Sequence, residues 1–420
     1  MDAQQHAVLG KVAWRIVPLL TLAYVVNYLD RTNISVAALT MNRDLGLSAS
    51  QFGLGAGILF IGYTVFEVPS NLALYRIGAR RWIARIMISW GLVSAATAWV
   101  DSAATYNIAR FALGVAEAGF FPGVTYYLAA WFPTEYRTRM LAWFLVAIPL
   151  STVIGSPVSG LLLEFDGILG FKGWQWLFIV EGLPALILGL AVLRVLADRP
   201  ETAAWLSPRE RETLTAMLAA ERRERPKTSL IAALSDSRVL ILGAVQFGFT
   251  LGSYGIGIFL PQLIKGFGLS NLASAALSAV PYVFASAGML WWSWHVDRTG
   301  KKIGNLAIAC AIGMLGLAAS VVSGNLLIAL TALTVALVGI TSARAIFWPI
   351  PTRFLSGVGA AGGLAFINSI GTAGGFAGPY LMGWLRDFTG SFEAGLLAMS
   401  GVLLAATLLA LSLKLVIKME

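Results

Sequence analysis

Twelve apolar stretches constrain the fold of this 420-residue chain more than any other feature. A helix of about 20 apolar residues spans a bilayer, and it satisfies its own backbone hydrogen bonds there. Hydrophobic residues make up 58% of the chain and charged residues 12%, which is typical of a multi-pass membrane protein. We expect spans near residues 14–38, 52–74, 82–100, 104–130, 140–162, 174–196, 237–264, 272–295, 302–322, 326–352, 358–384 and 392–416.

The basic residues indicate how these spans are oriented. With the N-terminus inside, 23 of the 30 Lys and Arg residues fall in cytoplasmic segments, which is the bias that fixes membrane topology. We therefore expect both termini in the cytoplasm, and the net charge of +9 does not indicate a nucleic-acid partner. The basic residues expected outside are Arg43, Lys172, Lys265 and Arg386. Those within helices are Arg31, Arg110 and Arg344.

The chain divides into two six-helix halves, residues 1–196 and 237–420. The segment 197–236 is the one long polar stretch and is expected to be a cytoplasmic linker. Ser207 followed by Pro208 predicts a short surface helix that begins there and extends toward Arg225. The single cysteine excludes an intrachain disulfide.

A loop motif occurs once in each half. Arg76, Gly78 and the pair Arg80–Arg81 follow the second span, and Arg298, Gly300 and the pair Lys301–Lys302 follow the eighth at the same spacing. With these loops the chain resembles the major facilitator superfamily, whose signature there is G-x-x-x-D-R-x-G-R-R. The second copy keeps Asp297, whereas the first has Asn71 for the glycine and Tyr75 for the aspartate.

The resemblance implies an all-α membrane protein of the bacterial inner (plasma) membrane. Its twelve helices would form two pseudo-symmetric six-helix bundles, with the substrate site near the midplane between them. It also implies a monomer surrounded by membrane lipid, with no cofactor other than protons as the coupling ion. The sequence contains no phosphate-binding G-x-x-x-x-G-K-[ST] loop and no pattern typical of an enzyme active site.

A narrower resemblance is to the anion:cation symporter family, which includes phthalate, tartrate and galactonate permeases. The residues that carry it are 27–31 (NYLDR), Tyr63 with 66–71 (FEVPSN), 116–119 (AEAG) with 122–123, 347–349 (FWP) and Asn368. This resemblance implies uptake of a small organic carboxylate with protons or sodium by alternating access.

Asp30 and Arg31 lie side by side in the first apolar stretch, where a charge is costly unless it is paired or faces a wet cavity. The resemblance assigns proton coupling to Asp30 and Glu117, because buried carboxylates can take and release protons. The alternative is that each is locked in a structural ion pair. Arg110 precedes Glu117 by seven residues on the same helical face and is a candidate partner.

Arg31 is the candidate anchor for a substrate carboxylate, because a guanidinium matches a carboxylate with two parallel hydrogen bonds. Arg344 precedes Trp348 by four residues, so both are expected on one face of the tenth span. Two cavity arginines would suit a dicarboxylate. The alternatives are a permanent ion pair for Arg31 and a lipid or loop contact for Arg344.

Uncharged side chains complete the expected binding site. Tyr63 is expected to donate to the carboxylate, and Trp348 to stack on or cap the substrate. Gln246 and Asn368 resemble family positions that hydrogen-bond the substrate. For these two amides the alternative is a hydrogen bond between helices.

These observations together predict a proton-coupled symporter for a phthalate- or tartrate-like acid. A sugar-acid symporter, similar to galactonate or hexuronate permeases, is the first alternative. An exchanger of organic anions is the second.

Overall fold

The computed structural model describes residues 3–145, 147–221, 235–322, 324–351, 354–355 and 357–416, and its regular elements over these ranges are helices. Eight helices among them are long and apolar enough to cross a membrane. The helices are α1 (Ala3–Asp44), α2 (Ala49–Ile77), α3 (Ala79–Ala96), α4 (Ala103–Glu117), α5 (Phe120–Trp131), α6 (Thr134–Leu145), α7 (Ala147–Leu163), α8 (Gly173–Val195), α9 (Pro208–Glu221), α11 (Ser237–Lys265), α12 (Asn271–Thr299), α13 (Lys302–Ser320), α14 (Leu326–Phe347), α15 (Gly357–Thr389) and α16 (Glu393–Val416).

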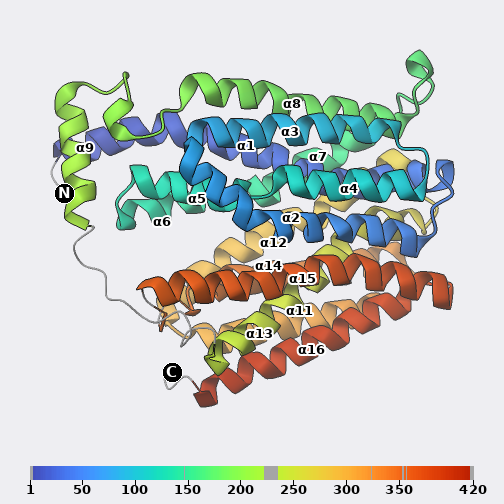
Figure 1. The fold of residues 1–420 in the computed structure, drawn as a ribbon. Helices are drawn as coiled ribbons and strands as arrows, with labels where there is room; N and C mark the ends of the chain where they lie inside the picture. Colours follow the sequence, from blue (N-terminus) through green and yellow to red (C-terminus); the bar gives the residue numbers. More distant parts are fainter. Residues whose placement is uncertain are drawn as a thin grey trace.

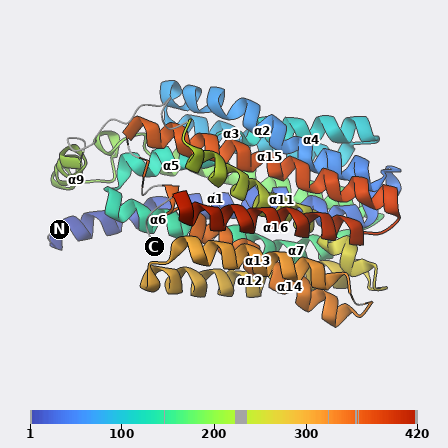
Figure 2. The same ribbon diagram turned by 90° about the horizontal axis from the view of Figure 1, so that it is seen from below.

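The expected twelve-span fold is confirmed, with α4 and α5 forming the fourth span and α6 and α7 the fifth. Helices α1 to α8 lie toward the top of Figure 1 and α11 to α16 toward its bottom. Both chain ends and α9 lie at the same end of the helices, which the basic residues identify as cytoplasmic (Figures 1 and 2).

The prediction of one continuous helix over 104–130 is wrong, because the fourth span breaks at Ala118–Gly119. Gly119 has φ +85°, a conformation that glycine adopts without strain. Ser70 of α2 donates to the Ala118 carbonyl oxygen at 2.6 Å, and Trp82 donates to the Ser70 hydroxyl at 3.0 Å. Glu117 is therefore the last residue of α4 and does not lie in mid-helix.

The tenth span also differs from its expected bounds of 326–352. Helix α14 ends at Phe347, and Trp348 lies directly after it. Pro349 and Pro351 follow, and neither has the backbone N–H that a continuing helix needs.

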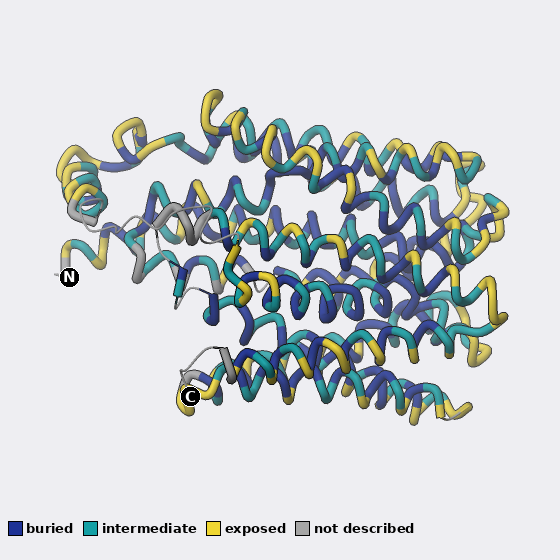
Figure 3. The backbone as a smooth tube through the Cα atoms, turned by 60° about the horizontal axis from the view of Figure 1, so that its bottom comes forward, coloured by how far each residue is buried: buried dark blue, intermediate teal, exposed yellow. Residues whose placement is uncertain are grey.

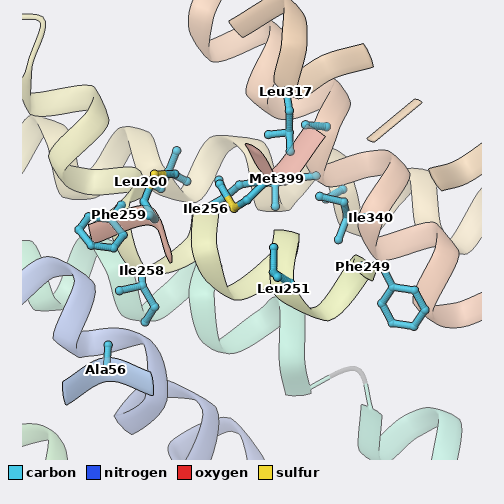
Figure 4. Packing of buried hydrophobic residues seen from close by; sticks show 14 of the residues in the cluster. Ala56, Phe249, Leu251, Ile256, Ile258, Phe259, Leu260, Leu317, Ile340 and Met399 are labelled. Carbon is cyan, nitrogen blue, oxygen red and sulfur yellow. The ribbon is translucent and has the colours of Figure 1, made fainter. Parts of the chain in front are cut away.

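The apolar core surrounds α11, whose side chains meet those of its neighbours (Figure 4). Phe249, Leu251 and Ile256 come from α11, and Ile340 and Met399 reach them from α14 and α16. Along most membrane helices, buried and exposed residues alternate with the helical turn (Figure 3). The outward-facing apolar residues are those that would meet lipid.

The two halves meet through α2 on α15 and α7 on α12. Gly53 lies against the backbone of Pro379, and Gly57 against that of Phe376. Asp387 of α15 accepts hydrogen bonds from the amides of Ala49 and Ser50, at 3.0 and 2.8 Å, and so caps the start of α2.

These contacts lie at the start of α2 and the end of α15. Both are on the external side of the membrane in the orientation that the basic residues indicate. Toward its cytoplasmic end, α2 instead exposes Val68 and Tyr75, by 66% and 75%. The two halves are therefore closed against each other on the external side.

Helix α9, in the segment between the halves, begins after Ser207. The Ser207 hydroxyl accepts from the Glu210 amide, and the Glu210 carboxylate accepts from the Ser207 amide. Lys11 donates to both Glu210 oxygens, at 3.0 and 2.9 Å, and this contact holds the pKa of Glu210 below its usual value. The residues expected to extend this helix toward Arg225 lie outside the described residues.

Gly53→Val is expected to shift the protein toward an outward-open state. A Cβ at Gly53 would lie 2.2 Å from the Pro379 carbonyl oxygen, so the external closure could not form without a backbone shift. Spin labels at Glu164→Cys and Glu393→Cys, in a Cys310→Ser background, should move apart in the distance distribution. Gly401→Val is the matched control, because nothing lies within 4 Å of its Cβ position. An unchanged distribution in Gly53→Val would contradict this account of the closure.

Candidate functional site

Asp30 is buried with 0% exposure and faces α3. Its Oδ2 accepts from the Trp90 indole N–H at 3.0 Å, and its Oδ1 accepts from the Ser94 hydroxyl at 2.6 Å. The Asn33 amide donates to Oδ1 at a longer 3.4 Å. Its hydrogen-bond partners are therefore uncharged groups.

Arg31 points to a different helix from Asp30, because adjacent residues lie roughly 100° apart around a helix. Its Nε donates to Glu117 Oε2 at 2.7 Å. The side chains of Arg31 and Glu117 are 11% and 0% exposed. The predicted anchor and one predicted proton carrier thus form a buried ion pair that joins α1 to the end of α4.

Arg110 does not take part in this pair, so the suggestion that it holds Glu117 is wrong in this structure. Arg110 is 1% exposed, and its Nε and Nη1 atoms have no hydrogen-bond partner among the described residues. The spacing of seven residues places Arg110 and Glu117 on one face, but Arg31 approaches from α1 and occupies the carboxylate.

Aromatic rings surround the Arg31 guanidinium and connect the two halves. The guanidinium carbon lies 4.9 Å from the Tyr63 ring centre and 5.7 Å from that of Tyr28. The hydroxyls of Tyr28 and Tyr254 are 3.3 Å apart, so α1 and α11 meet here. Tyr63 therefore lies beside Arg31, and its predicted contact with a substrate carboxylate stays a prediction.

Arg344 reaches the same tyrosines from the other half. Its guanidinium carbon lies 6.0 Å from the Tyr254 ring centre. The Tyr254 hydroxyl lies 3.3 Å from that of Tyr28, and the Tyr28 ring centre lies 5.7 Å from the Arg31 guanidinium carbon. Two arginines from opposite halves thus share one tyrosine cluster, which we define as Tyr24, Tyr28, Tyr63, Tyr254 and Tyr282.

The other predicted binding residues lie apart from this cluster. Gln246 Nε2 donates to Asn368 Oδ1 at 3.2 Å, which joins α11 to α15. Gln246 lies about two turns from Tyr254 toward the cytoplasm. Trp348 packs edge-on against Phe347, with ring centres 5.4 Å apart. In this structure Gln246 and Asn368 thus make a hydrogen bond between helices, which was the alternative to substrate binding. Gln246 Oε1 has no partner among the described residues.

An aromatic contact closes the site toward the external side. Phe60 of α2 meets Tyr254 edge-on at 4.5 Å between ring centres, and the Phe60 ring lies against Gly375 of α15. Phe52 and Phe259 make a similar contact one layer further out, at 5.4 Å. The site is therefore separated from the outside by side chains of both halves.

Sequence reasoning missed several of these partners. Trp90 and Ser94 lie on a third helix, and their relation to Asp30 follows from packing that the sequence does not display. Tyr282 carried no motif at all. Glu181 is buried as well and accepts from the Ser159 hydroxyl at 2.6 Å.

Comparisons with known proteins agree on the family. Residues 20–379 match the Major Facilitator Superfamily. A protein of Agrobacterium vitis named "Putative tartrate transporter" is 50% identical over 360 residues, covering 85% of this chain and 80% of that protein. The Inner membrane transport protein RhmT of Escherichia coli is 37% identical over 367 residues, covering 86% and 84%.

Solved structures share the fold at low sequence identity. The crystal structure of a bacterial homologue of the human lysosomal transporter Spinster, in an inward-facing and occupied conformation, has a TM-score of 0.80. Its sequence is 15% identical, and the match covers 96% of this chain and 97% of that one. This likeness supports the fold.

Removing Glu117 should destabilise the protein through Arg31. Glu117→Ala would leave a buried guanidinium without its carboxylate, a loss of about 3 kcal/mol. Glu117→Gln keeps a carbonyl oxygen that can accept from Nε, so its melting temperature should fall less. The exposed Glu164→Gln is the control for losing a carboxylate. Equal melting temperatures for wild type and Glu117→Ala would show that the ion pair adds nothing to stability.

Proposed function

The chain belongs to the major facilitator superfamily, and from that premise we propose that it imports a tartrate-like dicarboxylate together with protons. It is a transporter of the bacterial inner membrane, where it crosses the bilayer several times, and it is not an enzyme. The substrate class, the proton coupling and the residue roles below are the proposal.

The observation that carries the proposal is the Glu117 carboxylate on the Arg31 guanidinium at 2.7 Å. A carboxylate already occupies the group that would bind the substrate, so Glu117 and the substrate compete for Arg31. Protonating Glu117 removes its charge and weakens its hold on the guanidinium. A proton on Glu117 therefore makes Arg31 available to the substrate.

The second arginine supports a substrate with two carboxylates. Arg344 lies beside Tyr254 and Arg31 beside Tyr28, and the hydroxyls of these two tyrosines are 3.3 Å apart, so one small molecule can contact both arginines. Tyr63 and Tyr254 supply hydroxyl donors between them. The printed name of the Agrobacterium vitis relative supports tartrate as the first acid to test.

The proposed cycle uses both carboxyl groups of the first half. Asp30 and Glu117 take protons while the site is open to the outside, and the substrate binds Arg31 and Arg344. The halves then rock to the inward-facing arrangement, and the protons leave to the cytoplasm. The Arg31–Glu117 pair re-forms and expels the substrate carboxylate.

Proton coupling has a clear energetic use here. The inside-negative potential opposes anion entry by about 2.3 kcal/mol per charge per 100 mV. Each proton that enters with the anion cancels one such charge. Gln246 and Asn368, on the cytoplasmic side of Tyr254, are proposed to contact the leaving substrate, and Trp348 to line the same exit.

Uptake into proteoliposomes should depend on an inward proton gradient, and Asp30→Asn should weaken that dependence, because only the Glu117 proton site is left. The amide of Asn can still accept from Trp90 or Ser94, so the helix contact survives while the proton site is lost. The panel is tartrate, phthalate, galactonate, glucuronate and lactate, with Glu164→Gln as the control. Uptake that ignores the gradient but requires preloaded anion would indicate an exchanger, and galactonate or glucuronate as the preferred acid would indicate a sugar-acid symporter.

Arg344→Gln should reduce the preference for two carboxylates. Losing a charged hydrogen bond should weaken tartrate binding about tenfold and leave glycerate, which has one carboxylate, almost unchanged. The ratio of the two dissociation constants, from thermal-shift titration of the purified protein, measures this preference. Arg76→Gln, near the cytoplasmic end of α2, is the charge-matched control. Equal weakening of both acids would contradict a second carboxylate on Arg344.

A further inference from the structure

A separate cavity lies on the external side, beyond the contacts that close the two halves. Its volume is about 590 Å³. It is lined from both halves, by Asn42 of α1, by Gln262 and Lys265 of α11, and by Arg386 and Asp387 of α15. The aromatic contacts of Phe60 and Phe52 separate it from the tyrosine cluster.

Basic residues are concentrated at this cavity, although the external segments as a whole contain more carboxylates than basic residues. In the orientation set by the charges, six carboxylates and four basic residues lie outside. Two of the four basic residues, Lys265 and Arg386, line the cavity, and Arg43 acts electrostatically on Lys265. The Asp387 carboxylate is engaged by the first amides of α2 at 3.0 and 2.8 Å.

In the part of the chain that the structure describes, the two basic side chains of the cavity donate to backbone carbonyl oxygens. Lys265 Nζ donates to the Leu39 carbonyl oxygen at 2.9 Å. Arg386 donates to the Gly390 carbonyl oxygen and lies 5.1 Å from the Phe392 ring centre. Gln262 Nε2 is buried and has no partner among the described residues. Two cations and an unused amide N–H in one cavity form a donor set for a carboxylate.

We propose that this cavity is an external binding site for the organic anion, in which Lys265, Arg386 and Gln262 hold a carboxylate before the central site opens. This inference rests on the proposed uptake of a carboxylate. It adds a second site for the same kind of anion. Lys265 of this site lies six residues after Phe259, on the external side of the contact between Phe259 and Phe52.

The site also affects the external closure. Lys265 belongs to α11 and Leu39 to α1, so their hydrogen bond ties the two halves together. A bound carboxylate competes with the Leu39 carbonyl for the Lys265 ammonium and is the stronger acceptor. Arrival of the anion outside therefore weakens one of the contacts that keep the external side closed.

Transport measured from each face tests the site. In right-side-out vesicles, Lys265→Gln and Arg386→Gln should raise the KM for tartrate about tenfold, as expected for one lost charged hydrogen bond. In inside-out vesicles Arg386→Gln should keep the wild-type KM, because the cytoplasmic face lacks this cavity and the Arg386 side chain contacts Gly390 and Phe392 within its own half. Lys172→Gln, the external basic residue away from the cavity, should match wild type in both. Unchanged KM values, or equal rises on both faces, would overturn the inference.

A binding measurement distinguishes failure of the external site from failure of the proposed transport. Purified Arg31→Gln should still bind tartrate by calorimetry, through the external site alone, and the added Lys265→Gln should weaken that binding about tenfold. Absence of binding in Arg31→Gln would overturn the external site. If wild type transports no tartrate while Arg31→Gln binds it, the external site stands and the proposed transport fails.

Discussion

The buried ion pair between Arg31 and Glu117 constrains the centre of this protein. Each of these two charges, which have little or no exposure, compensates the other, and removing either leaves an uncompensated buried charge. The pair requires α1 to lie beside the end of α4, and the break at Gly119 places Glu117 at that end. A straight fourth span would continue the helix through this position.

Asp30 and Arg31 are adjacent on α1, but their side chains lie in two different environments. Asp30 faces the hydrogen-bond donors of α3, and Arg31 faces Glu117 and the tyrosine cluster. The two carboxyl groups, on α1 and α4, thus lie on different sides of one turn of α1. The tyrosine cluster connects Arg31 with Arg344 of the other half through the contact between Tyr28 and Tyr254.

The bilayer makes the fold largely predictable from the sequence. Spanning helices need long apolar stretches, and the distribution of basic residues fixes their direction, so the span count and the class of fold were both correct. The break at Gly119 was not predicted, because it depends on Ser70 of α2 supplying a hydrogen bond to Ala118. The sequence suggested Arg110 as the partner of Glu117, because helical spacing identifies only neighbours on the same helix. The partner in the structure is Arg31, which lies on α1. Tyr63 was singled out by its motif and lies beside Arg31, whereas Tyr282 carried no signal in the sequence.

In the proposed mechanism, the Glu117 carboxylate and the substrate carboxylate compete for the Arg31 guanidinium. Substrate import therefore requires proton import. The most direct test is to add tartrate to proteoliposomes that hold a pH-sensitive dye, with no pH gradient and no membrane potential imposed. We predict that the lumen acidifies as tartrate enters, at a rate that follows the uptake. Tartrate entry with no change of internal pH would contradict the coupling.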